Sequence, residues 1–420
     1  MLRIFILAIL TSCFVFSQNP INPNILPYIS KKDSLNSIEE LKRDFKAILS
    51  RDPIVRANYG VCVYSLDRKE YLINLNENTP LTPASITKLF TTFNALYNFG
   101  NDATINTEVW YEDNDIDDKV INNHLYIVGN GDALLSKNDI DDLFFKVKAK
   151  GVNKIEGDIM FDLSCFDDET NRVEYSGDNE VVEPVGEISA FSISRKTGEQ
   201  SYKLIQNSLA QNNISFTGNF NVCKRPETSD ATELKLLASS QRPLIDIVNI
   251  TNKNSDNYLA EHLFKMNASR NSRFKRDYDN SRDLLFSTLD KLKIECPNCD
   301  INDGSGLSRR NKVTAKSVVQ LLSTATQQAF GKEYYNSLSI ASKDGTLRNR
   351  MHETSAETYV HAKTGTLRNA SGLAGYTTTI DGERLAFAFI FNGNSVGSYK
   401  QTENELAELL SGFFYYNVVN

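Results

Sequence analysis

Three short stretches of the chain carry side chains that together could turn a serine hydroxyl into a nucleophile. Ser85-Ile-Thr-Lys88 places a hydroxyl and an amine three residues apart at the start of an apolar run, and Ser255-Asp-Asn257 and Lys363-Thr-Gly-Thr366 follow in chain order. A lysine can take the proton of a serine when its amine is kept uncharged, which burial or a nearby cation achieves. This combination predicts a serine nucleophile with a lysine base.

Histidine- and metal-dependent hydrolysis finds less support. The chain has four histidines, and none of them forms an HExxH or other helical metal-binding pair. A histidine triad stays open, because triad residues are neighbours in space and not in sequence. We predict no metal and no organic cofactor.

The Lys363 stretch would supply both a second cation and a surface for substrate. Its charge would disfavour a charge on Lys88. The hydroxyls of Thr364 and Thr366 are placed to hold a substrate carboxylate, and Gly365 would let the substrate lie close to the strand backbone.

Each of these motifs also occurs elsewhere, so none decides the question alone. Ser272-Arg-Phe-Lys275 repeats the first spacing within a polar stretch, and Lys196-Thr-Gly repeats the third where Thr197 is expected to cap a helix. The set at positions 85, 255 and 363 differs, because its members are expected at a helix start, a second helix start and a strand. We therefore favour that set.

The first motif opens a predicted helix with one buried face that ends at Gly100. Its apolar residues recur at helical spacing: Ile86, Leu89, Phe90, Phe93, Leu96 and Tyr97. Ser85 is then in the first turn, and Lys88 lies one turn further on the same side.

Elements at both ends of the chain predict one sheet. An amphipathic helix opens at Ser37, and a hairpin joined at Asp67-Arg68 follows it. Near the end, three strand-like runs, two of them joined by an Asp381-Gly382 turn, precede a helix over 402–414. We expect an α/β (α+β) fold with an antiparallel sheet flanked by helices.

The middle of the chain has a different texture, with short strands broken by Asn, Asp and Gly and helices near 137–150 and 199–212. Gly129-Asn-Gly131 lacks the remaining residues of a phosphate-binding loop and predicts a tight turn. We assign 104–240 to an inserted accessory domain, and 18–103 with 241–420 to a discontinuous catalytic domain.

Composition and the N-terminal residues limit the partners and the cellular location that can be expected. The chain of 420 residues has a net charge of −7, which gives no reason to expect nucleic acid or an anionic membrane as a partner. Residues 1–17 carry Arg3 and an apolar run too short to span a bilayer, which predicts a signal peptide and export to the periplasm or cell envelope. Acylation of Cys13 as a lipoprotein is the less favoured alternative. No transmembrane segment is expected after residue 17, and the sequence leaves the oligomeric state open.

The cysteines do not form a disulfide framework, because five remain after the predicted cleavage and they are spread widely. Cys296-Pro-Asn-Cys299 is the only close pair. A local disulfide or two unreactive thiols are both compatible with it.

The three motifs in this order resemble those of penicillin-binding proteins and serine β-lactamases. Further blocks narrow the resemblance to the D-alanyl-D-alanine carboxypeptidase/endopeptidase family of class C penicillin-binding proteins (peptidase family S13): YIVGNGDALLS, GDIMFDLSCFDD, NDGSGLSRRNKVTAKSVVQLL, SKDGTLRNRM and AKTGTLRNASGLAGYTTT. It covers roughly residue 38 to the C-terminus. It implies a transpeptidase-like fold with an inserted, smaller β-rich domain.

This resemblance also implies an activity. Ser85 would attack the carbonyl between terminal D-alanines of peptidoglycan stem peptides or cross-links, and Lys88 would take its proton. Ser255 would relay a proton to the leaving amine, and Asn257 would hold the substrate backbone. β-Lactam antibiotics would acylate Ser85. Larger members carry two extra domains, whereas Ser85 and Ser255 are here only 255 − 85 = 170 residues apart, so the role of the second domain is not carried over.

Two other functions are compatible with these motifs. A β-lactamase needs a base for rapid deacylation, and the glutamates between the second and third motifs lack the Glu-x-x-Leu-Asn context of class A enzymes: Glu261, Glu295, Glu333, Glu353 and Glu357. A non-catalytic wall-binding protein or penicillin sensor has no need for a neutral lysine. We place both behind a DD-peptidase.

Overall fold

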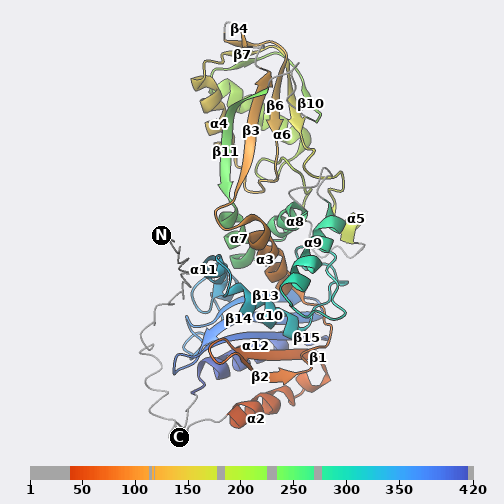
Figure 1. Cartoon of the computed structure of the whole chain (residues 1–420), viewed down its shortest axis with the longest axis vertical. Coiled ribbons are helices and arrows are strands. Elements are labelled where there is room, and N and C mark those ends of the chain that lie inside the picture. Colours follow the sequence, from red (N-terminus) through yellow and green to blue (C-terminus); the bar gives the residue numbers. More distant parts are fainter. Residues whose placement is uncertain are drawn as a thin grey trace, which may run out of the picture.

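Figure 1 shows the computed structural model of the chain. The structure describes residues 38–112, 116–117, 119–176, 185–224, 234–268 and 277–414. The predicted signal peptide and the Ser272–Lys275 stretch lie outside these residues. Within them, no helix has the length and apolar character needed to cross a membrane.

A six-stranded sheet in the order β12-β13-β14-β15-β1-β2 forms the centre of the main body. Its strands are β1 (Asn58–Ser65), β2 (Glu70–Leu75), β12 (Ser339–Ile340), β13 (His361–Leu367), β14 (Ala370–Thr378) and β15 (Arg384–Asn392). All neighbouring strands are antiparallel, and β1 from the front of the chain pairs with β15 from the back. The predicted α/β fold class, with a sheet built from both chain ends, is confirmed.

Helices cover both faces of this sheet because β15 is apolar on both sides. Phe387, Phe389 and Phe391 pack with helices α2 (Ile38–Leu49) and α12 (Val396–Ser411). The alternate residues Ala386, Ala388 and Ile390 face the other core, with helices α3 (Thr87–Phe99) and α10 (Ala315–Ala325). Helix α12 begins six residues before the predicted start at 402.

The second core also holds the helices that approach the sheet from the middle of the chain: α7 (Leu244–Lys253), α8 (Asn257–Met266), α9 (Tyr278–Lys291) and α11 (Gly331–Asn336). Helix α3 packs against α7, α8 and α9 and lies centrally among them (Figure 1). It is buried on nearly all sides and ends at Gly100, whose φ is 84°, as its sequence predicts.

Most of the region between residues 104 and 243 lies at the top of Figure 1, where its two sheets form a body of their own, whereas residues 172–176 lie lower, beside α9. A five-stranded sheet has the order β10-β8-β6-β3-β11, and a four-stranded sheet has the order β4-β5-β7-β9. Its strands are β3 (Thr104–Glu112), β4 (Ile116–Asp117), β5 (Val120–Ile121), β6 (His124–Val128), β7 (Lys154–Ile155), β8 (Asp158–Asp162), β9 (Ser215–Phe216), β10 (Phe220–Val222) and β11 (Leu234–Pro243). Its helices are α4 (Lys137–Ala149), α5 (Arg172–Ser176) and α6 (Gly198–Gln211).

This body, called the inserted region below, has an apolar core of its own between its sheets and α4 and α6. The helices predicted near 137–150 and 199–212 correspond to α4 and α6. Cys296 and Cys299 lie in the main body and form a disulfide, which resolves the alternative left open by the sequence.

Candidate active site

Ser85 lies in a sharp turn directly before α3. The turn is the single 3-10 turn η2 (Ala84–Ile86), so Ser85 precedes the α-helix by two residues instead of lying in its first turn. Ala84 has a φ of 50°, a left-handed conformation that costs a non-glycine residue about 1–2 kcal/mol. The strained turn leaves Ser85 partly exposed while its neighbours Ala84 and Ile86 are fully buried. The hydroxyl is therefore accessible.

Lys88, one turn further along, is completely buried, and its amine lies close to several oxygen atoms. Its Nζ lies 2.9 Å from Ser85 Oγ, 2.7 Å from Asn257 Oδ1 and 2.6 Å from the Ser305 carbonyl oxygen. The last two oxygens can only accept hydrogen bonds. An uncharged amine can donate to both and direct its lone pair at the Ser85 hydroxyl. The geometry suits an amine that accepts the serine proton.

Ser255 and Lys363 form the second part of the cluster. Ser255 has a φ of 57° and accepts a 2.8 Å hydrogen bond from Lys363 Nζ, which also donates to the Thr364 carbonyl oxygen at 3.0 Å. Burial, followed by the charge of Lys88, holds the pKa of Lys363 well below its ordinary value. Because Coulomb repulsion is mutual, a proton on either amine disfavours a proton on the other.

Strand β13 presents its alternate residues to different surroundings, as the period of two requires. Lys363 and Gly365 are buried, whereas Thr364 is half-buried and Thr366 is exposed. A side chain at 365 would place its Cβ 2.6 Å from the Pro83 carbonyl oxygen. Gly365 therefore lets η2 pack against β13, and its role in making room for substrate stays a prediction.

Residues 303–308, which the sequence analysis quoted without assigning a role, complete the surroundings of Lys88. Ser305 supplies the carbonyl that accepts from Lys88, and the neighbouring Gly304 carbonyl accepts from Thr91 Oγ1 at 2.8 Å. A Cβ at Gly306 would lie 1.9 Å from the Ala84 carbonyl oxygen. Two glycines around a serine were the available signal of such close backbone packing.

Thr346 is a second residue that sequence reasoning missed. It lies in the 3-10 turn η4 (Gly345–Leu347), and its Oγ1 accepts a 2.9 Å hydrogen bond from Thr364 Oγ1. It therefore adds a hydroxyl beside the two threonines of β13. The block SKDGTLR contains it, but no spacing in the sequence points from Thr346 to β13.

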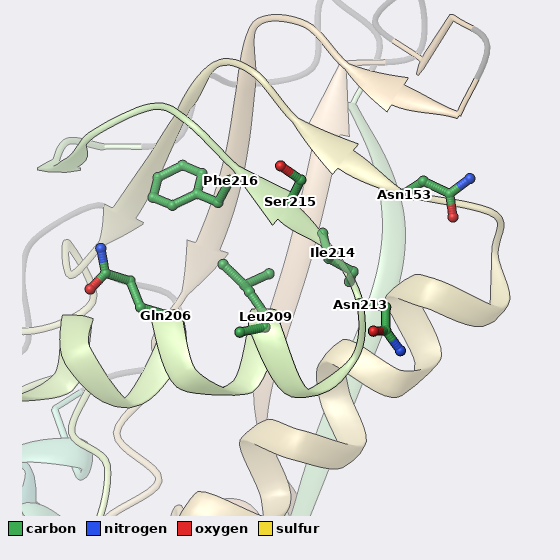
Figure 2. Close-up of a pocket in the computed structure, with 8 residues that line it drawn as sticks. Asn153, Gln206, Leu209, Asn213, Ile214, Ser215 and Phe216 are labelled. Atoms are coloured by element: carbon green, nitrogen blue, oxygen red, sulfur yellow. The ribbon is translucent and has the colours of Figure 1, made fainter.

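A pocket of about 530 Å³ lies in the inserted region, outside this cluster (Figure 2). Its lining comes from the end of α6, the β9 strand and one residue before β7, and all of it is uncharged: Asn153, Gln206, Leu209, Ala210, Asn213, Ile214, Ser215 and Phe216. None of the predicted site residues is among them. The pocket holds no acid, base or cation, so the reactive groups are those around Ser85.

The described residues contain no group of three or more His, Cys, Asp or Glu side chains placed to hold a metal ion. The absence of a cofactor stays a prediction. What the structure does assemble is one hydroxyl nucleophile, two buried amines and a second hydroxyl, drawn from three separate stretches of the chain.

Comparison with known protein families identifies the hydrolase family of this chain. The model of the D-Ala-D-Ala carboxypeptidase 3 (S13) family matches residues 41–197 and 181–412, which is most of the chain. The chain belongs to the S13 family. Membership identifies it as a serine hydrolase of the DD-peptidase class, which confirms the predicted family and enzyme class.

Individual S13 relatives agree with this assignment. The D-alanyl-D-alanine carboxypeptidase of Actinomadura sp. (strain R39) is 28% identical over 448 residues, covering 85% of this chain and 82% of that protein. The carboxypeptidase DacB of Haemophilus influenzae is 31% identical over 206 residues, or 48% of this chain and 42% of that protein.

Solved structures show the same fold. Penicillin-binding protein 4 (DacB) from Haemophilus influenzae superposes with a TM-score of 0.76 at 21% identity, over 91% of this chain and all of that one. Bd3459, a peptidoglycan endopeptidase from Bdellovibrio bacteriovorus, superposes with a TM-score of 0.56 at 14% identity, over 87% of this chain and 95% of that one. The S13 chain thus has the penicillin-binding protein fold predicted for it.

Proposed function

We propose that this S13 enzyme hydrolyses peptidoglycan peptides through an acyl-enzyme on Ser85. Its substrates are D-Ala-D-Ala termini, D-Ala-containing cross-links, or both. Ser85 Oγ attacks the carbonyl carbon of the penultimate D-alanine, and the Lys88 amine takes its proton. The observation that carries the proposal is the buried Lys88 Nζ, held 2.9 Å from a partly exposed Ser85 hydroxyl by two carbonyl acceptors.

The other members of the cluster take complementary roles. The backbone N–H groups of Ser85 and Thr366 bind the oxyanion, each worth about 3 kcal/mol in comparable sites. Ser255, hydrogen-bonded to Lys363, passes a proton to the leaving amine. Lys363 and the hydroxyls of Thr364 and Thr366 bind the substrate carboxylate. Water then attacks the ester and releases Ser85.

Asn257 takes two roles in this proposal. Its Oδ1 accepts from Lys88, which the sequence did not indicate, and its amide nitrogen is the donor that holds the substrate backbone. Asp256 caps the helix that carries it by accepting from the Leu259 N–H. Asn257 is thereby fixed at the first position of α8.

The partners and location follow from the same chemistry. Peptidoglycan lies outside the cytoplasmic membrane, so the enzyme acts after export, in the periplasm or cell envelope. β-Lactams are proposed as covalent inhibitors. In support, penicillin-binding protein 4 of Haemophilus influenzae has been solved in complex with a β-lactam, and Bd3459 has been solved acylated by penicillin G.

A β-lactamase is the weaker proposal, because no glutamate among the described residues is placed as a deacylating base. Glu261 is the one nearest the cluster, but it is fully buried, and its oxygens accept from Tyr175 and from the Gly304 and Ser305 N–H groups. A carboxylate held in this way has no access to an attacking water. Slow deacylation, the mark of a penicillin-binding protein, is expected.

Two substrates test the proposal. Purified enzyme is incubated with a pentapeptide ending in D-Ala-D-Ala and with cross-linked muropeptides, and the products are separated by chromatography. Release of D-alanine, opening of cross-links, or both is expected, with neither reaction in Ser85→Ala. A fluorescent penicillin separates the alternatives: a lasting adduct supports a DD-peptidase, rapid loss of label supports a β-lactamase, and no adduct supports a non-catalytic protein.

A further inference from the structure

We propose that Arg172 and Tyr175, two residues of the short helix α5 in the inserted region, are positioning residues for Lys88. They act through two buried carboxylates, Asp303 and Glu261, that fix the backbone carbonyl facing the Lys88 amine. This inference rests on the proposed function of Lys88 and gives the inserted region a part in the chemical step.

The first link is a single peptide unit between Ser305 and Gly306. Its carbonyl oxygen accepts from Lys88 Nζ at 2.6 Å, and its N–H donates to Asp303 Oδ1 at 2.8 Å. The C=O and N–H of a trans peptide point in opposite directions. Asp303 on one side therefore sets the direction of the carbonyl on the other, and the two hydrogen bonds polarise each other.

The preceding peptide unit repeats this arrangement. The Ser305 N–H donates to Glu261 Oε1 at 2.9 Å, and the Gly304 carbonyl accepts from Thr91 Oγ1 at 2.8 Å. Glu261 Oε2 also accepts from the Gly304 N–H at 3.1 Å. Two successive peptides are thus held between a carboxylate and a side chain of α3, so this loop has little freedom to move relative to Lys88.

Helix α5 provides a partner for each carboxylate. Arg172 Nη1 lies 3.2 Å from Asp303 Oδ2, and Tyr175 donates to Glu261 Oε2 at 2.8 Å. The Arg172 side chain is only 4% exposed, and that of Asp303 is not exposed at all, so their charges are paired away from water. Removing one partner of such a pair leaves an uncompensated buried charge, which the structure relieves by moving.

The two carboxylates also affect each other. Burial and then the charge of Asp303 raise the pKa of Glu261 to about 7, whereas the Ser305, Tyr175 and Gly304 hydrogen bonds oppose this rise. Arg172 offsets the Asp303 charge, and the Tyr175 hydroxyl supplies one of the three donors to Glu261. Helix α5 therefore favours the ionised, accepting form of Glu261, the form that holds the loop.

The predicted consequence is specific to the chemical step. If α5 loses these contacts, the Ser305 carbonyl is no longer aimed at Lys88, and the amine lone pair is no longer aimed at Ser85. Substrate binding should change little, since the proposed carboxylate site is made by Lys363, Thr364 and Thr366 of β13, which α5 does not contact in this chain of hydrogen bonds. The acylation rate constant should therefore fall while the reversible binding constant stays nearly unchanged.

Four variants of the full chain test this with a fluorescent penicillin, whose time course of labelling gives a reversible binding constant and an acylation rate constant. Tyr175→Phe removes only one hydroxyl, and Arg172→Met removes one charge. Tyr376→Phe removes a buried hydroxyl that donates to the Leu322 carbonyl in the main body. Arg350→Met leaves the buried Glu403 without its arginine on the opposite face of the sheet.

We expect the acylation rate constant to fall about fivefold in Tyr175→Phe and at least about twentyfold in Arg172→Met, with the binding constant within about twofold of the wild type. Tyr376→Phe and Arg350→Met should match the wild type in both constants. Wild-type acylation by both α5 variants, or an equal loss in the two control variants, would overturn the inference. If the wild type and the controls are not labelled at all, the proposed function fails instead.

Discussion

The inserted region and the main body differ in what they bury. The inserted region packs an apolar core between its sheets and helices, and its pocket is lined by uncharged residues. Around α3 the main body buries three amines and two carboxylates completely: Lys88, Lys265, Lys363, Glu261 and Asp303. Buried charges are costly unless they are paired, so they mark the part of the fold that is shaped for reaction and not for stability alone.

The border between the two regions is formed in part by polar contacts near the catalytic motifs. The inserted region meets the catalytic motifs through a few polar side chains: Arg172 and Tyr175 contact the carboxylates behind Lys88, and Arg195 pairs with Asp256 between Ser255 and Asn257. Its influence on catalysis should therefore be strong at α5 and weaker at Arg195, which is half exposed.

Lys88→Met should have the largest effect. Removing the base should lower the rate of acylation by a penicillin about a thousandfold, because positioned proton transfer contributes a factor of about this order. Labelling time courses measure the loss. Lys265→Met is the control, since Lys265 is equally buried but pairs with Asp167 of the inserted region. It should acylate within a few-fold of the wild type. Similar losses in both variants would remove the distinction between the two lysines.

Gly306→Ala should have the next largest effect. Its Cβ would lie 1.9 Å from the Ala84 carbonyl, and its φ of 84° is unfavourable for alanine. We expect a loss of at least about 4 kcal/mol in the free energy of unfolding, from overpacking and backbone strain. In the inserted region, Gly151 has a φ of 99° but open space around it.

Gly151→Ala should accordingly cost only about 1–2 kcal/mol. Urea unfolding at pH 7 compares the two glycine variants. Equal losses would mean that the tight contact between Gly306 and η2 is not a constraint on the fold.

Two buried histidines should make the folded state less stable in acid, one at the border between the two regions and one in the sheet. His262 on α8, beside Phe166 of the inserted region, and His361 on β13 both have a pKa lowered to about 4, mainly by burial. Their contribution to stability is present above about pH 6.5 and is lost as the pH falls to about 4. Each shift corresponds to a loss on the order of 3 kcal/mol. Glu261, with its raised pKa, opposes this by stabilising the fold at low pH.

His262→Gln and His361→Gln should each flatten the decline in unfolding free energy between pH 6.5 and 4 by a similar amount. Urea unfolding at several pH values measures the slope for each variant. A slope that both substitutions leave unchanged would show that neither histidine is neutral and buried as described.

Arg195→Ala should have the smallest effect. The side chain is 52% exposed, so its pair with Asp256 is screened by solvent and salt. We expect acylation to slow about twofold in low salt and to match the wild type at high salt. Arg384→Ala, which breaks a comparably exposed pair with Asp67 in the sheet, should not change acylation at any salt concentration. A large, salt-independent loss in Arg195→Ala would reveal a role that exposure does not suggest.

Much of the fold could be predicted because its periodic patterns agree with its packing. The apolar stripe from Ile86 to Tyr97 became α3, and the strand runs near the C-terminus became β13, β14 and β15. The starts of the helices were predicted less accurately. Ser85 precedes the α-helix instead of lying in its first turn, and Thr197 stands at the N-cap of α6 without a side-chain capping bond. A short strained turn such as η2 has no hydrophobic periodicity from which it could be predicted.

The surroundings of Lys88 could be predicted only in part. Ser85, Asn257 and Lys363 stand in recognisable motifs, whereas the Ser305 carbonyl is a backbone group and leaves no signature of residue type. Glu261 was weighed only as a deacylating base, because its contact with a loop more than forty residues away is a property of the fold. The packing of Gly365 against η2 could not be predicted, because the sequence does not say which face of a strand meets that turn.

The most direct test of the account is the site of penicillin acylation. The wild-type protein and the Ser85→Ala and Lys88→Met variants are treated with a β-lactam, digested and examined by mass spectrometry. The account predicts one adduct in the wild type, on the peptide containing Ser85, none in Ser85→Ala, and only slow labelling in Lys88→Met. An adduct on any other residue, or full labelling of either variant, would contradict it.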